Sequence, residues 1–141
     1  KKRLYDKTRE ILCRRKAAAR TMRSTFMQLN WLIQGWINYY RIGSMKAFLD
    51  VYGQWLRHKV RVVILKQWKR PKAIYRNLRK MNRIVNGGFE DDRLSSIANA
   101  RQGWYRMANI REINFLLNPT ILGKRTKDRP GLVDPLAYYL S

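Results

Sequence analysis

The chain has 141 residues, with 31 Lys and Arg against 9 Asp and Glu, so its formal net charge is +22. Hydrophobic residues make up 45% of it, which is enough for a packed core and excludes wholesale disorder. The charge exceeds what solubility requires and is typical of a protein with a polyanionic partner. No apolar run is long enough to span a membrane, and a single cysteine, Cys13, excludes a disulfide within the chain. We therefore expect a nucleic-acid partner and no membrane partner.

Apolar residues at helical spacing predict a first helix over residues 4–15 and a second over residues 22–40. In the second helix, Trp36 and Tyr40 are assigned to the core. Gly43 predicts the end of this helix, and Ser44 predicts the N-cap of a third over residues 45–68. The chain opens at Lys1 rather than Met, which suggests a piece of a longer protein.

The third predicted helix has an apolar arc centred on Trp55, which we assign to the core. Arg57, Arg61 and Trp68 follow one another at i, i+4 and i+11 on the opposite face, where they would form an exposed stripe. Lys59 lies inside the apolar arc, and the core assignment does not explain it.

After the third helix, Pro71 restarts the chain in a short basic helix over residues 72–81. The turn at residues 86–88 is the best candidate boundary and divides the chain into domains at 1–84 and 85–141. Asp91 or Asp92 would cap a helix that ends at Asn99. One or two further helices are predicted over residues 101–117. Residues 136–140 would form a last helical turn that packs back on the rest of the protein. The pattern predicts an all-α fold, with a three-helix bundle followed by a smaller helical C-terminal region.

Groups able to do catalysis are sparse. The one acidic cluster, Glu90-Asp91-Asp92, is contiguous and opens a helix, which favours compensation of the helix dipole over a metal site built from separate segments. His58 has no Cys, His or acid at ligand spacing, and Cys13 has no evident base partner. We expect no catalytic centre, no metal and no cofactor.

The distribution of basic residues along the chain points to a binding surface. No acid occurs between Asp50 and Glu90, and aromatic residues are interleaved with the basic run. Such side chains neutralise phosphates and stack on exposed bases, although the pattern does not separate RNA from DNA. The predicted nucleic-acid-binding residues are Arg57, Arg61, Lys66, Trp68, Lys69, Arg70, Lys72, Arg76, Arg79, Lys80 and Arg101.

Two motifs carry a resemblance to a known family. The run LNWLIQGWINYY at residues 29–40 and the run KQWKRPK at residues 66–72 resemble the maturase-specific domain of group II intron-encoded proteins. The run ANARQGWYRMA at residues 98–108 is similar to an element that follows this domain in many bacterial members. The resemblance extends from about residue 7 to residue 118.

The resemblance implies the thumb of a reverse transcriptase, with a role in binding group II intron RNA and assisting its splicing. Its partners would be the intron RNA, an RNA–DNA duplex or target DNA, and an upstream finger-palm region that holds the polymerase chemistry. The segment FEDD at residues 89–92 is not a polymerase motif, so the chain would be a non-catalytic fragment of an RNA-directed DNA polymerase. Its location would be the bacterial cytoplasm or an organelle.

Two alternatives remain open on the sequence. The same surface would serve an accessory domain that grips the RNA–DNA template-primer duplex. A stand-alone basic protein that binds DNA or has a structural role would carry a similar charge. Beyond Pro119 the sequence departs from the family pattern, which leaves a DNA-binding role of the tail unsupported.

Overall fold

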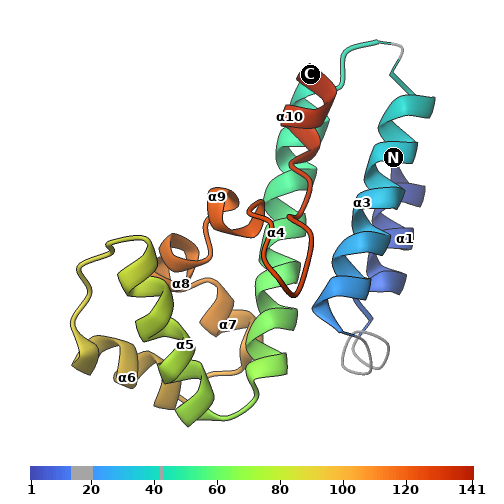
Figure 1. Ribbon diagram of the computed structural model, residues 1–141. Helices are drawn as coiled ribbons and strands as arrows, with labels where there is room; N and C mark the ends of the chain where they lie inside the picture. Colours follow the sequence, from blue (N-terminus) through green and yellow to red (C-terminus); the bar gives the residue numbers. More distant parts are fainter. Residues whose placement is uncertain (14–20, 42) are drawn as a thin grey trace.

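The computed structural model describes residues 1–13, 21–41 and 43–141, and every regular element in these ranges is a helix (Figure 1). Three of them, α1 (Lys2–Ile11), α3 (Met22–Tyr39) and α4 (Lys46–Trp68), lie side by side at the N-terminal end of the fold. The predicted all-α fold and first bundle are therefore confirmed. Residues 14 and 15, predicted to end the first helix, lie outside the described residues.

The long helix α4 connects this bundle to a second group of helices. The second group consists of α5 (Pro71–Ile84), α6 (Asp91–Asn99), α7 (Trp104–Ala108) and α8 (Arg111–Leu116). A short helix α9 (Pro119–Leu122), which the sequence did not predict, leads to α10 (Pro135–Leu140). As predicted, α10 returns to the bundle, where it packs against α4 and α3 (Figure 1).

The core of the bundle is apolar with one buried hydroxyl pair. Leu4, Phe26 and Ile33 are fully buried, and so is Tyr52 of α4. The hydroxyl groups of Thr8 and Tyr52 share a hydrogen bond of 2.7 Å, and Thr8 Oγ1 also donates to Leu4 O at 2.7 Å. Burial raises the pKa of Tyr52, which keeps the phenol neutral. The pair thus satisfies its polar atoms and links α1 to α4 without introducing a charge.

The core assignment of Tyr40 is wrong, because Tyr40 lies just past the end of α3 and is 46% exposed. Trp36 is partly buried and packs against the core, as predicted. The predicted cap of the next helix is also wrong. Ser44 does not cap the next helix, since Met45 occupies the N-cap position and no side chain caps α4. Thr21 caps α3 instead, accepting a 3.2 Å hydrogen bond from Ser24 N.

The turn after α5 forms where it was predicted, and its geometry requires glycine. Asn82 Nδ2 donates to Phe89 O at 2.8 Å, and Phe89 N donates to Asn82 Oδ1 at 3.3 Å. A Cβ on Gly87 would clash with Asn82 Oδ1, and Gly88 has a φ of +70°. The turn brings α6 against α5, so the helices on either side of residue 84 pack together.

The acidic run after this turn does not cap α6 as predicted. Glu90 occupies the N-cap position, and its side chain makes no capping hydrogen bond. Asp91 and Asp92 instead lie in the first helical turn, where their charges oppose the positive end of the helix dipole. Asp91 also pairs with Arg79 of α5, at 3.4 Å from its Nε.

Asn30, from the middle of α3, holds the C-terminal segment against the bundle. Its Nδ2 donates to Gly131 O at 2.8 Å, and its Oδ1 accepts from Val133 N at 2.8 Å. Eight residues further along the same helix, Asn38 Oδ1 accepts a 3.1 Å hydrogen bond from the Tyr138 hydroxyl. Polar residues of the family signature therefore bind the backbone and side chains of residues about a hundred positions away.

Candidate nucleic-acid interface

The main basic surface is one side of α5. Lys72, Arg76, Arg79, Lys80 and Arg83 fall within an arc of about 100° on a helical projection, and all five are exposed. Ile74 and Leu78, on the opposite side of the helix, are buried against the core. Because α6 and α8 pack on α5, this basic arc is presented by a supported helix rather than by a loop.

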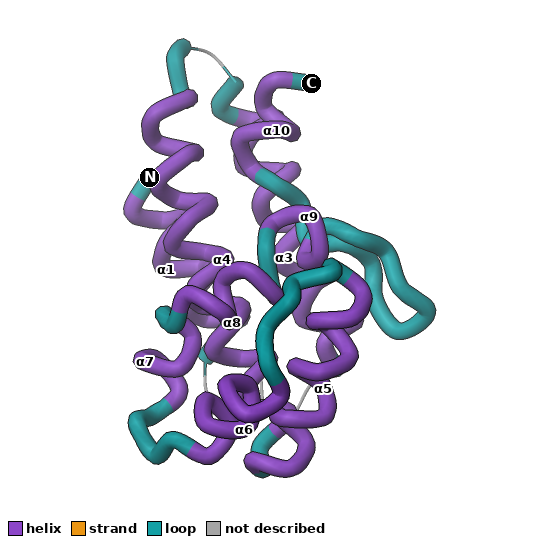
Figure 2. Tube along the Cα trace, turned by 90° about the vertical axis from the view of Figure 1, so that its left-hand side faces the viewer, coloured by secondary structure: helices purple, strands orange, loops and turns teal. Residues whose placement is uncertain are grey.

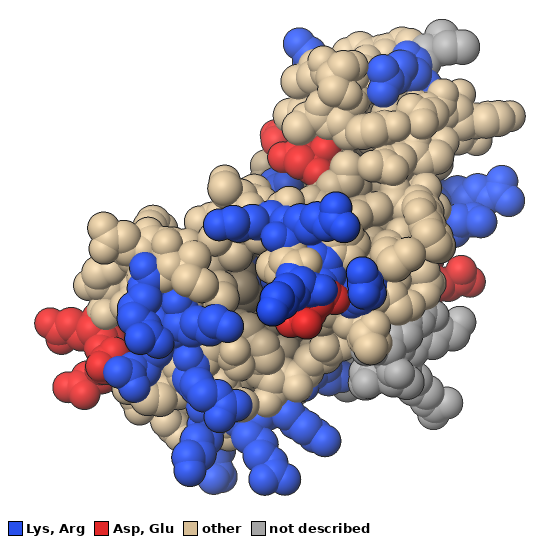
Figure 3. Space-filling view, viewed as in Figure 1, with Lys and Arg blue, Asp and Glu red and all other residues tan. Residues whose placement is uncertain are grey.

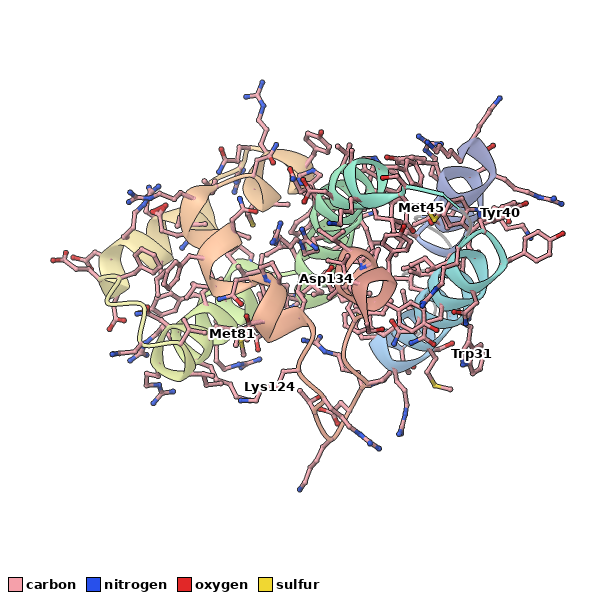
Figure 4. All side chains as sticks on the ribbon, turned by 90° about the horizontal axis from the view of Figure 1, so that it is seen from above. Trp31, Tyr40, Met45, Met81, Lys124 and Asp134 are labelled. Carbon is pink, nitrogen blue, oxygen red and sulfur yellow. The ribbon has the colours of Figure 1, made fainter. Side chains whose placement is uncertain are left out.

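A second group of cations lies beside α5 on the same face. Figure 3 shows Lys and Arg side chains gathered over α5 and over the segment that follows α9. We call residues 123–131 the basic loop; Lys124, Arg125 and Lys127 are exposed on it. Figure 4 shows Lys124 on this loop, away from the side of the bundle that carries Trp31 and Tyr40.

Backbone hydrogen bonds and one partly buried cation, Arg129, hold the basic loop in place. Thr126 N donates to Arg129 O at 2.9 Å, and Leu132 N donates to Leu122 O at 2.8 Å. The Arg129 guanidinium lies 4.9 Å from the Phe26 ring centroid, and burial lowers its pKa. Sequence reasoning missed this loop, although four basic residues between Gly123 and Gly131 were a readable signal.

The predicted exposed stripe on α4 is wrong. Arg61 is only 7% exposed, and its Nε donates to Leu117 O at 2.8 Å. Burial, together with the charge of Arg57, lowers the pKa of Arg61 to about 10. The guanidinium of Arg57 lies beside Gly53, a residue that Pro135 of α10 also approaches. Because α10 packs on α4, the partly buried Arg57 and the buried Arg61 do not form an exposed stripe.

The other predicted residues are distributed along the chain between α4 and α7. Lys66 and Trp68 are partly buried near the end of α4, and Trp68 packs against the core. Lys69 and Arg70 are exposed at the bend before α5, and Arg101 is exposed between α6 and α7. The structure therefore places four of the predicted residues, Lys72, Arg76, Arg79 and Lys80, on the basic arc, with Lys69 and Arg70 exposed just before it. Arg57 and Arg61 lie on the covered face of α4, and Trp68 packs against the core.

The buried acid among the described residues, Glu112, is engaged in an ion pair within the fold. Glu112 is buried and accepts a 2.6 Å hydrogen bond from Arg93 Nε, which lowers the pKa of this carboxyl. Among residues 1–13, 21–41 and 43–141, no three His, Cys, Asp or Glu residues gather as a metal site would require. Within the same ranges, no helix is both long and apolar enough to cross a membrane.

Comparison with known proteins supports the resemblance found in the sequence. A family model described as "Group II intron, maturase-specific domain" matches residues 1–84, which is more than half of the chain. The match covers α1, α3, α4 and α5, including the basic arc. No curated protein matches the chain. The chain therefore belongs to the group II intron maturase-specific domain family, which implies a maturase-type role in group II intron splicing.

Proposed function

We propose that this chain binds folded group II intron RNA and assists its splicing, as the thumb portion of a reverse transcriptase. One observation carries the proposal, the basic arc of α5. Within the described residues, the ion pairs found at this arc join only Arg79 to Asp91. The remaining cations, among them Lys72, Arg76 and Lys80, are exposed and available to phosphates.

The physical basis is electrostatic attraction by a rigid surface. Each phosphate neutralised by Lys or Arg releases condensed counterions, which is a favourable and salt-dependent contribution to binding. Because α5 is held by the core through Ile74 and Leu78, little conformational entropy is lost when the arc meets RNA. Exposed cations of the basic loop lie on the same face and extend the surface (Figure 3).

In this proposal the chain supplies binding alone. The polymerase chemistry resides in a finger-palm region of the reverse transcriptase. The protein would act where the intron is transcribed, in the bacterial cytoplasm or in an organelle.

The test is binding to a folded group II intron RNA in the presence of competitor tRNA and of duplex DNA. We expect intron binding to survive both competitors, and affinity to fall by about 10³-fold or more between 50 and 200 mM salt if six or so phosphates are contacted. Equal loss to every competitor would contradict specific recognition. Preferred binding to an RNA–DNA duplex would identify a template-primer grip instead.

A further inference from the structure

A second surface lies where α1, α4 and α7 meet. Figure 2 shows α1 and α7 on one side of the molecule, and α5, α9 and the basic loop on the opposite side. At this junction a pocket of about 200 Å³ is lined by Arg9, Leu12, Trp55 and Lys59. It is smaller than the roughly 300–1,000 Å³ of sites for drug-sized ligands, so it has room for one small group only.

Cations and aromatic rings alternate across this junction. The Arg9 guanidinium lies 5.3 Å from the Trp55 ring centroid, and Lys59 Nζ lies 5.8 Å from the same ring. Lys59 Nζ is also 5.9 Å from the ring of Tyr105 in α7. Tyr105 is 59% exposed and meets the His58 ring edge-on, with centroids 4.3 Å apart. The junction therefore offers two cations and an accessible aromatic ring within one side chain's reach of each other.

Packing of α1 on α4 does not by itself account for these cations. That contact already contains Tyr5, whose ring lies 5.3 Å from Tyr52 and 4.7 Å from Trp55. In the described ranges Lys59 has no carboxylate partner, and Arg9 pairs with the exposed Asp6 at 3.1 Å. Burial and the charges of Lys59 and Arg61 lower the pKa of His58, which is consistent with a positive potential here.

We propose that this junction binds one unpaired nucleotide of an RNA, with its phosphate between Arg9 and Lys59 and its base stacked on Tyr105. The proposal rests on the RNA-binding function proposed above and adds a second contact on the opposite face. A stacking ring can reach a base only where the strand is unpaired, because bases in a duplex are covered by their neighbours. The α5 face would bind phosphates of any RNA strand, whereas this junction would bind only a nucleotide whose base is unpaired.

The experiment compares two probes on the 141-residue chain, an eight-nucleotide uridine RNA and a blunt RNA duplex of sixteen base pairs. The first variant is Arg9→Gln with Lys59→Gln, which removes two charges and keeps the side-chain stems. The matched control is Lys124→Gln with Lys127→Gln, which removes two charges from the basic loop. A third variant, Tyr105→Leu, removes the ring without changing the charge.

We expect the Arg9/Lys59 variant to bind the oligonucleotide at least about 10-fold more weakly, with its salt slope reduced by about 0.7 for each cation removed. Its duplex affinity should change by less than a factor of about 2, and the control should show the reverse preference. Tyr105→Leu should weaken oligonucleotide binding by about 5- to 150-fold at an unchanged salt slope, as expected for one stacking ring. Arg9→Lys should restore most of the affinity that Arg9→Gln loses.

Equal weakening of both probes by the two charge variants would overturn the proposal, as would unchanged oligonucleotide binding in Tyr105→Leu. Failure of the wild-type chain to bind the oligonucleotide would also overturn it. Thermal unfolding followed by circular dichroism shows that each variant is folded. Failure of the wild-type chain to bind folded intron RNA would contradict the proposed function instead, so the two outcomes are distinguishable.

Discussion

Helices α3 and α5 both lie within the family match, yet the exposed side of α3 is almost uncharged and the exposed side of α5 is basic. Between Arg23 and Arg41 the sequence of α3 contains no charged residue, in a chain with a net charge of +22. It exposes Trp31, at 65%, and contributes Asn30 to the contact with the C-terminal segment. α5 exposes a basic arc, and in the described contacts its asparagine side chains bond to backbone no more than seven residues away. The comparison shows that the signature motif in α3 contributes to packing of the fold, whereas α5, which lies outside that motif, carries the basic arc.

The largest expected effect concerns the buried side of α3. Ile33 is fully buried, so Ile33→Ala should lower the free energy of unfolding by about 2–5 kcal/mol through lost burial and a residual cavity. Urea unfolding followed by circular dichroism measures it. Trp31→Ala on the exposed side of α3 is the control, with an expected change within about 0.5 kcal/mol. Similar losses in both variants would mean that the exposed side of α3 is also packed.

The next effect concerns the charge of α5. The triple change Lys72→Gln, Arg76→Gln and Lys80→Gln should reduce the slope of log affinity for intron RNA against log salt by about 2–3 units. Stability should not fall, because all three side chains are exposed and repel one another.

The matched control for α5 removes the same number of charges from α1, by Lys2→Gln, Arg3→Gln and Lys7→Gln. These side chains are exposed on the N-terminal helix. We expect a slope change of less than about one unit for this control. An equal change in the two triple variants would show that net charge, rather than the basic arc, determines binding.

A smaller effect is expected at Asn30. Asn30→Ala removes two hydrogen bonds to the C-terminal segment, each contributing about 0.5–1.5 kcal/mol, so stability should fall by about 1–3 kcal/mol. Hydrogen exchange of the Val133 amide, which donates to Asn30, should accelerate. Asn99→Ala is the control, because Asn99 is exposed and bonds only within its own helix in the described contacts. Unchanged Val133 exchange would argue against the anchoring role.

The smallest effect is a dependence on pH. The hydrogen bond from Arg93 lowers the pKa of Glu112 in the folded state, so ionised Glu112 stabilises the fold at neutral pH. This contribution is complete above the unfolded pKa of about 4.3 and is lost as pH falls through the folded pKa. Thermal unfolding between pH 7 and 3 should therefore show a steeper decline for the wild type than for Glu112→Gln. Parallel curves would mean that the ion pair makes no contribution.

Helix positions could be predicted because their signals are local. Residues 22–40 and 45–68 were predicted as helices, and the structure has them at Met22–Tyr39 and Lys46–Trp68. Apolar periodicity, Pro71 at the start of α5 and the glycines of the 86–88 turn act within a few residues of the elements they define. The family resemblance also lies in contiguous runs of sequence, and for that reason it could be recognised before the fold was known.

The all-α class, the helices up to residue 84, the family and the concentration of charge between Asp50 and Glu90 can all be recognised in the amino-acid sequence alone. Which of the cations are exposed depends on how the helices pack. Helical periodicity shows which residues share a face, but it does not show what covers that face. Arg61 is buried where it donates a hydrogen bond to Leu117 O, 56 residues away. Asn30 bonds to Gly131 and Val133, which are 101 and 103 residues away. The junction of α1, α4 and α7 has the same physical origin, since no single segment encodes a contact among three.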